Sequence, residues 1–256
     1  PPSTPAPASG VIGVRQAQLT PDFWIRRDPD ANRVVLDSAA ISAQNAKLQQ
    51  LDRSIHDIEH LPATLSGAQV RQWIEDLSSR PADVVYDAQG QEIAAATLDG
   101  LIDSLALDSI PASQATRYGL VVHRADLRTF PTQLRVFSSR GDTDIDRFQE
   151  NALFPGTPVA VMHESRDGQW WFVVSPLYRA WIEKDKVAVG SAEQVFAYTR
   201  KTPYLVVTGA TAHTVYTPER PEVSELQLEM GVRVPVFADW SAEKPVNGQH
   251  SYTAHV

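Results

Sequence analysis

The sequence contains no cysteine among its 256 residues. Disulfides, thiolate zinc ligands and a cysteine nucleophile are therefore excluded within these residues. Basic side chains are also scarce, since 23 Lys and Arg stand against 31 Asp and Glu for a formal net charge of −8. Binding to a phosphate backbone needs clustered cations, so nucleic acid is not expected as a partner. No apolar run approaches the roughly 20 residues that cross a bilayer, and no transmembrane segment is expected.

Residues 1–10 contain only Pro, Ser, Thr, Ala and Gly. This composition favours a flexible, polyproline-like leader over a packed element. In exported bacterial proteins such a leader often follows a signal peptide or a lipid anchor that is lost from the sequence. A disordered end or a remnant of cloning accounts for the composition equally well, so the leader by itself does not decide on export.

Residues 11–116 are expected to form a mainly helical domain. Within 37–60, apolar side chains recur at the spacing of one buried helical stripe. They are Ile41, Leu48, Leu51, Ile55 and Ile58. A second helix is expected to begin at Ser66, with Gln69 as its capping-box partner, and a third, shorter one covers 98–105.

The apolar period changes to two from Tyr118 onward, which predicts strands. Asp167-Gly168 lies between two such runs, 158–164 and 169–174, and is a strong hairpin signal. Four further short strands are expected. They are 180–182, 204–208, 213–216 and 232–237. Strands at this spacing are typical of small barrels, and a weak repeat between 127–161 and 206–237 predicts a second one.

Several ordered motifs within about 60 residues resemble the first bacterial SH3-type domain of multidomain NlpC/p-sixty cell-wall peptidases. They are Leu127–Thr132, Asp144–Glu150, Pro155–Val159 and Ser165–Trp170. Val223–Pro235 and Pro245–His250 resemble the second such domain. The resemblance implies a multidomain α+β fold, in which the helical domain precedes two small SH3-like β-barrels at 117–200 and 201–256. The second is short enough to lack its last strand.

In that family a papain-like domain follows the barrels and cleaves the bond between D-glutamate and a diamino acid in peptidoglycan stem peptides. Its nucleophile lies in an Asp-Cys-Ser-Gly motif, which this sequence lacks. The chain therefore resembles the non-catalytic, targeting and substrate-gating portion of such an enzyme. The resemblance implies stem peptides and a papain-like domain as partners, the latter beyond Val256 or on another chain. It also implies export to the periplasm or cell envelope. A stand-alone wall-binding or scaffold protein is the alternative.

The resemblance also indicates a substrate groove, because the long first loop of the first barrel borders the active site in relatives. There it helps to admit peptides with a free N-terminal L-alanine. The matching loop, 138–154, carries Asp144, Asp146 and Glu150. One of these carboxylates would pair with the ammonium group of the peptide. The family often uses a tyrosine for this contact, and this loop has none.

Aromatic residues near the hairpin offer a second candidate surface, because exposed rings can stack on sugars or peptides. Trp170 and Trp171 are adjacent on one strand and must point to opposite faces. One of them is expected in the core and the other at the surface. We take Trp171 and Tyr178 as candidates for wall binding.

The run His56-Asp57-Ile58-Glu59-His60 matches the H-x-x-E-H arrangement of inverted zinc peptidases. Two histidines that close a helix also interact favourably with its dipole, and no downstream acidic helix offers a third ligand. We therefore expect no metal and no cofactor, and a metal-dependent hydrolase stays a distant alternative. His163, Ser165 and Asp167 also suggest a hydrolytic triad, but as neighbours in one hairpin they favour a structural role.

Overall fold

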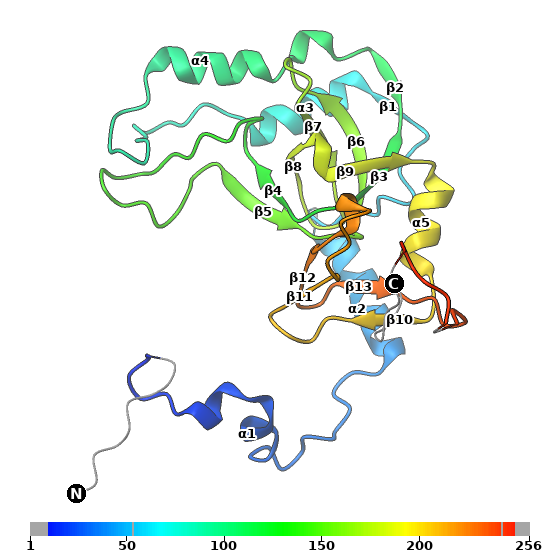
Figure 1. Ribbon diagram of the computed structural model, residues 1–256. Coiled ribbons are helices and arrows are strands. Elements are labelled where there is room, and N and C mark those ends of the chain that lie inside the picture. Colours follow the sequence, from blue (N-terminus) through cyan, green and yellow to red (C-terminus); the bar gives the residue numbers. More distant parts are fainter. Residues whose placement is uncertain (1–9, 53, 242, 249–256) are drawn as a thin grey trace, which may run out of the picture. The chain divides into compact units, whose positions relative to one another are not determined.

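The computed structural model describes residues 10–52, 54–241 and 243–248. The fold is mixed α+β, with helices in the N-terminal part and a large antiparallel sheet (Figure 1). The chain divides into two compact units between Leu51 and Asp52, and each is described by itself. No helix of the described ranges is both long enough and apolar enough to cross a membrane.

The first unit contains a short 3-10 helix, Gln16–Leu19, and the helices α1 (Pro21–Ile25) and α2 (Ser38–Leu51). The Asp37 carboxylate accepts a hydrogen bond from the Ala40 amide at 2.7 Å, as a capping side chain does at a helix start. None of the residues of α2 is buried. Within its own unit, the helix therefore buries no apolar stripe.

The helix expected over 37–60 is correct in its first half and wrong in its second, because α2 ends at Leu51. The Asp52 carboxylate accepts hydrogen bonds from the amide and the hydroxyl of Ser54, at 2.9 and 2.7 Å. This local turn competes with a further helical turn. Ile58, at 3% exposure, lies in the core of the second unit. One periodic pattern thus combined residues from two separate units.

The second unit contains the helices α3 (Gly67–Leu77) and α4 (Ala95–Ser104). In the sequence they lie between β1 (Thr64–Ser66) and β2 (Ser113–Ala115), two strands that pair antiparallel. Both expected helices are confirmed. Ser66 caps α3 as predicted, since its hydroxyl accepts from the Gln69 amide at 3.2 Å. The reciprocal bond from the Gln69 side chain, which the expected capping box needs, is not found among the described residues. Long loops and a 3-10 turn at Leu107–Ser109 separate these elements, so the N-terminal part is less helical than expected.

Seven antiparallel strands form the main sheet in the order β5-β4-β8-β7-β6-β3-β9. They are β3 (Arg117–Val121), β4 (Ala125–Arg128), β5 (Gln149–Leu153), β6 (Pro158–Glu164), β7 (Trp170–Val174), β8 (Arg179–Glu183) and β9 (Val187–Gly190). The Asp167-Gly168 hairpin between β6 and β7 is confirmed, with Gly168 at φ +70°. Within the described residues β5 and β9 are edges, so the hydrogen bonds do not close a barrel.

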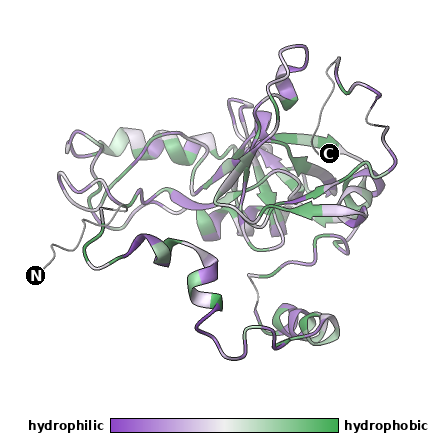
Figure 2. Cartoon of the chain, turned by 60° about the horizontal axis from the view of Figure 1, so that its bottom comes forward, coloured by the Kyte–Doolittle hydropathy of each residue, from purple (hydrophilic) through white to green (hydrophobic). Residues whose placement is uncertain are grey.

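Both faces of the central strands β6, β7 and β8 are buried. Figure 2 shows hydrophobic residues along the strands of the sheet. On β7, Trp171 and Val173 pack into a cluster to which all seven strands contribute, whereas Trp170 and Phe172 pack with α3, α4 and α5. The two tryptophans thus point to opposite faces as expected. The expectation that one of them is exposed is wrong, because their exposures are 6% and 7%. Helices cover the face that would otherwise meet water.

Helix α5 (Ala192–Arg200) follows β9 and was not predicted. Its start is a capping box, in which the Ser191 hydroxyl accepts from the Gln194 amide and the Gln194 side chain accepts from the Ser191 amide. Val195 and Phe196 are buried, and the Phe196 ring lies 5.2 Å from that of Tyr118 on β3. The spacing from Ser191 to Gln194 is the same signal that identified α3.

The C-terminal region contains two separate ladders, and a 3-10 turn at Pro221–Val223 lies in the connection between the two strands of the inner one. They pair β10 (Tyr204–Val206) with β13 (Arg233–Pro235), and β11 (Thr211–His213) with β12 (Gln227–Glu229). β10 and β13 lie within the strands expected at 204–208 and 232–237, although both are shorter. β11 shares only His213 with the strand expected at 213–216, and β12 was not predicted. Most of the expected leader, residues 1–9, and the motif residues Gln249 and His250 lie outside the described residues.

A hydrogen-bonded junction joins the end of α3 to the sheet. Ser78, the C-cap of α3 at 3% exposure, accepts a bond from the Trp181 indole at 3.0 Å and donates to the Thr129 carbonyl at 2.6 Å. Trp181 itself is fully buried on β8. The junction therefore satisfies a buried indole N–H and fixes α3 against the sheet.

Replacement of this hydroxyl tests the junction. We expect Ser78→Ala to lower the free energy of unfolding by about 1–3 kcal/mol, because the Trp181 indole is left buried without an acceptor. Urea unfolding followed by tryptophan fluorescence measures the loss. Ser109→Ala is the control, since that hydroxyl bonds only within its own turn. Equal effects of the two substitutions would contradict the junction.

Candidate functional site

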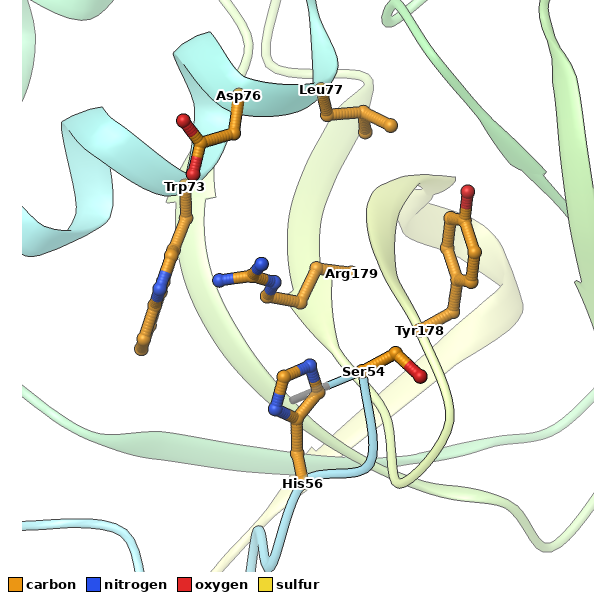
Figure 3. Close-up of a pocket in the computed structure, with 7 residues that line it drawn as sticks. All are labelled: Ser54, His56, Trp73, Asp76, Leu77, Tyr178 and Arg179. Carbon is orange, nitrogen blue, oxygen red and sulfur yellow. The ribbon is translucent and has the colours of Figure 1, made fainter. Parts of the chain in front are cut away.

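A pocket of about 220 Å³ opens where three segments of the second unit converge (Figure 3). The chain before β1 contributes two polar residues, α3 contributes three residues from its last turns, and the start of β8 contributes two. They are Ser54, His56, Trp73, Asp76, Leu77, Tyr178 and Arg179. The pocket is therefore a product of the tertiary fold and belongs to no single motif.

The orientation of α3 determines which of its side chains reach the pocket. Val70 and Ile74 are fully buried against the core. Trp73, Asp76 and Leu77 are spaced by three and four residues, so they share a neighbouring face of the helix. Figure 3 shows this face above the start of β8. Burial of the apolar stripe thus presents an indole and a carboxylate to the pocket.

Arg179 supplies the positive charge of the pocket. Its guanidinium carbon lies 5.3 Å from the centre of a Trp73 ring, within the range of a cation–π contact. Burial lowers the pKa of Arg179, and the negative charge of Asp76 acts in the opposite direction. An arginine side chain nevertheless stays protonated at neutral pH. The pocket therefore contains a fixed cation beside an aromatic face.

His56 contributes a neutral imidazole. Its backbone amide donates to the Pro176 carbonyl at 2.8 Å, which ties the segment to the turn before β8. Burial lowers the pKa of His56 below its usual value, and the nearby charge of Arg179 lowers it further. The ring is consequently unprotonated at pH 7 and has one N–H to donate.

Two of the expected site residues, Glu150 and Tyr178, lie together although they are 28 positions apart. The Tyr178 hydroxyl donates to one oxygen of Glu150, and the Thr129 hydroxyl donates to the other at 2.6 Å. Burial, followed by the bond to Glu150, raises the pKa of Tyr178 to about 12. The expected loop 138–154 ends in a strand, because Glu150 lies on β5. This segment has no tyrosine of its own, but the connection from β7 to β8 brings one to Glu150.

Asp144 and Asp146 line a different pocket, of about 390 Å³. Asp146 lies 2.5 Å from Arg128, and their side chains are 8% and 3% exposed. The other oxygen of Asp146 accepts from the amides of Val136 and Phe148, at 3.1 and 3.0 Å. Asp146 is thus engaged in holding its loop, whereas the side chain of Asp144 is exposed.

Trp171 lies apart from both pockets. Its indole donates to Glu164 at 3.2 Å, and the Lys184 ammonium lies 5.3 Å from its ring centre. Because the ring is buried in the core between the strands, it does not present a face to a ligand. The structure therefore separates Trp171 from the pair that Glu150 and Tyr178 form.

The histidine motif does not form a helical metal site, because the helix ends before it at Leu51. His56 faces the pocket, while His60 is exposed and bonds to Asp57 at 2.8 Å. The zinc-peptidase alternative and our helix-terminus interpretation both need a helix here, and both are wrong. Within the described ranges, no group of three or more His, Asp or Glu could hold a metal ion.

The hairpin residues have structural roles, as expected. His163 is buried, and its Nε2 lies 2.9 Å from the Leu105 carbonyl. Ser165 donates to Asp167 at 2.6 Å within the turn. Their bonds are thus made to the backbone and to each other, without a triad.

Trp73 and Arg179 were missed as site residues. Trp73 lies within the helix expected to begin at Ser66, which gave it no functional signal, and Arg179 carried no signal besides its position next to Tyr178. Their proximity arises from the packing of α3 on β8. Sequence spacing does not encode that contact.

Comparison with known proteins identifies part of this region. The family model of the SH3 domain (SH3b1 type) matches residues 135–183, a range that contains Glu150, Tyr178 and Arg179. A solved structure of an NlpC/p-sixty (NlpC/P60) endopeptidase from Photobacterium damselae subsp. piscicida matches with a TM-score of 0.52 at 18% identity. That match covers 67% of this chain and 37% of the other. No curated protein sequence matches. The chain thus contains an SH3b domain and shares the fold of part of an endopeptidase.

The two aspartates of the loop provide a matched test of its structure. We expect Asp146→Ala to cost about 3–5 kcal/mol of unfolding free energy, because the buried guanidinium of Arg128 loses its carboxylate counterion and keeps only neutral acceptors. Asp144→Ala should change stability by less than about 0.5 kcal/mol, as exposed positions do. Chemical denaturation of both variants measures the difference. Similar losses would show that the ion pair does not anchor the loop.

The bond between Tyr178 and Glu150 has a spectroscopic consequence. In ¹³C NMR titrations the Tyr178 ring should ionise at a pH of about 12. Glu150→Gln should lower that pKa part of the way toward 10, since the carboxylate charge is lost while burial and a neutral amide acceptor remain. Glu193→Gln, at an exposed position of α5, serves as the control. An unchanged Tyr178 pKa in Glu150→Gln would disprove the coupling.

Proposed function

We propose that these residues bind and position peptidoglycan stem peptides for an endopeptidase of the NlpC/p-sixty type whose nucleophile lies outside them. The observation that carries this proposal is the pairing of Glu150 with Tyr178 inside the SH3b match, beside a pocket. The shared fold with part of an NlpC/p-sixty endopeptidase supports the same assignment. The absence of cysteine agrees with a non-catalytic role.

Glu150 is the group that would receive the N-terminal ammonium of the peptide. Its two oxygens already accept bonds from Tyr178 and Thr129, which fix the carboxylate in one orientation. Each carboxylate oxygen keeps further acceptor capacity, so an ammonium can add a charge-assisted bond. Tyr178 stays protonated throughout the physiological range and continues to donate. The role of both residues is to hold the peptide, while a thiolate on a papain-like domain performs the cleavage.

The proposal includes an architecture. Residues 11–116 form the N-terminal domain, and residues 117–200 and 201–256 form two SH3-like barrels that border the groove of the catalytic domain. The seven-stranded sheet and its tightly packed inner cluster support the first barrel, and the two C-terminal ladders support the second. Because peptidoglycan is extracytoplasmic, the proposal also places the protein in the cell envelope.

Peptide binding tests the proposal directly. The probe is the tripeptide L-alanyl-γ-D-glutamyl-diaminopimelate, compared by calorimetry with its N-acetylated form. We expect the free amine to bind and acetylation to weaken binding about tenfold, because one charge-assisted contact is lost. Glu150→Gln should weaken binding of the free amine by a similar factor and leave the acetylated peptide unaffected.

Glu193→Gln, which removes an exposed carboxylate elsewhere, is the control and should bind like the unmodified chain. Product analysis of the same mixtures should show intact peptide, since these residues contain no thiol. Equal binding of both peptides, or cleavage by the purified chain alone, would overturn the proposal.

A further inference from the structure

The guanidinium of Arg179 has neither a hydrogen bond nor an ion pair with any residue that the structure describes. Other arginines of the second unit are paired: Arg128 with Asp146, and Arg166 with Asp103 and Asp108. Arg179 is half-buried, and burial lowers its pKa. Partial burial of a cation without a bonded counterion costs free energy, and a bound anion would offset this cost.

The surroundings of Arg179 are arranged around its charged end. Figure 3 shows the guanidinium between the Trp73 indole and the His56 ring. Trp73 covers it from one side at 5.3 Å, and Leu77 adds an apolar wall. The neutral imidazole of His56 offers a further donor at the same opening. These groups leave a cavity of about 220 Å³ in front of the cation.

We propose that Arg179, Trp73 and His56 form a binding site for the carboxylate of a small ligand. The planar guanidinium can donate two parallel hydrogen bonds to a carboxylate, and His56 can donate a third. The cavity is smaller than the roughly 300 Å³ of the smallest typical ligand pockets, so it accommodates one residue-sized group. Glu150, which would bind a cation, is not among the described residues that line this pocket, although its partner Tyr178 is. The inference rests on the surroundings of Arg179 and does not depend on the proposed function.

The charge of the lining distinguishes a carboxylate from a phosphate. Among the described residues that line the pocket, Arg179 is the one cation, and the Asp76 carboxylate accepts a hydrogen bond from the Gln72 side chain at 2.7 Å. A singly charged carboxylate is balanced by Arg179, whereas a doubly charged phosphate would also face Asp76. The site is therefore expected to prefer carboxylates.

The test is an NMR titration of the full chain with small probes, which observes the indole N–H of Trp73 and the side-chain N–H of Arg179. N-acetylglycine carries a terminal carboxylate, and N-acetylglutamic acid α-amide carries a side-chain carboxylate. N-acetylglycinamide is the neutral match, and inorganic phosphate is the competing anion. We expect saturable shifts with at least one carboxylate, and affinity at least about tenfold weaker for the amide. The probe that binds more tightly shows whether the site takes a terminal or a side-chain carboxylate.

Arg179→Gln removes the charge and should weaken carboxylate binding at least about tenfold, whereas Arg179→Lys should retain part of it. Arg220→Gln is the matched control, because that exposed arginine pairs with Glu222 away from the pocket. Dispersed indole resonances verify that each variant is folded. The inference is overturned if the amide binds as well as the acid, if phosphate binds more tightly, or if folded Arg179→Gln retains full affinity.

Discussion

The packing of α3 on the sheet is the constraint on which the described part of the second unit depends. Val70 and Ile74 bury one stripe of the helix, and Ser78 ties its end to Trp181 and Thr129. This contact covers a face of the sheet that would otherwise be wet, which explains why Trp170 and Trp171 are both buried. The same contact brings Trp73 over Arg179. Core packing and pocket geometry therefore have one origin.

The parts of the fold that could be predicted are those with local signals. The cap at Ser66 and the turn at Asp167-Gly168 each fix a conformation within a few residues, and both were identified correctly. The helix α5 has the same kind of signal at Ser191, so it was predictable although it was overlooked. The prediction that the helix of α2 continues to residue 60 was wrong for another reason. Ile58 fits the apolar spacing, but its side chain packs in the core of the second unit.

The candidate site was predictable where the resemblance to a known family indicated Glu150 and where the aromatic residues near the hairpin indicated Tyr178. Glu150 and Tyr178 were both selected, but their contact across 28 positions was not foreseen. Asp146 was selected for its charge, but its carboxylate forms a buried ion pair with Arg128. A carboxylate in a loop has the same sequence signature whether it binds a ligand or an internal arginine. Only burial and hydrogen-bond partners distinguish the two, and these depend on tertiary packing.

The pair of Arg128 and Asp146 has a consequence for protein engineering. It clamps the base of the loop through the amides of Val136 and Phe148, while residues 138–145 at the tip are mostly exposed. The backbone of a tip that is anchored at its base can change length without disturbing the strands beneath it. A fluorophore or an affinity tag inserted there would report on the mouth of the neighbouring cavity while the β-structure stays intact.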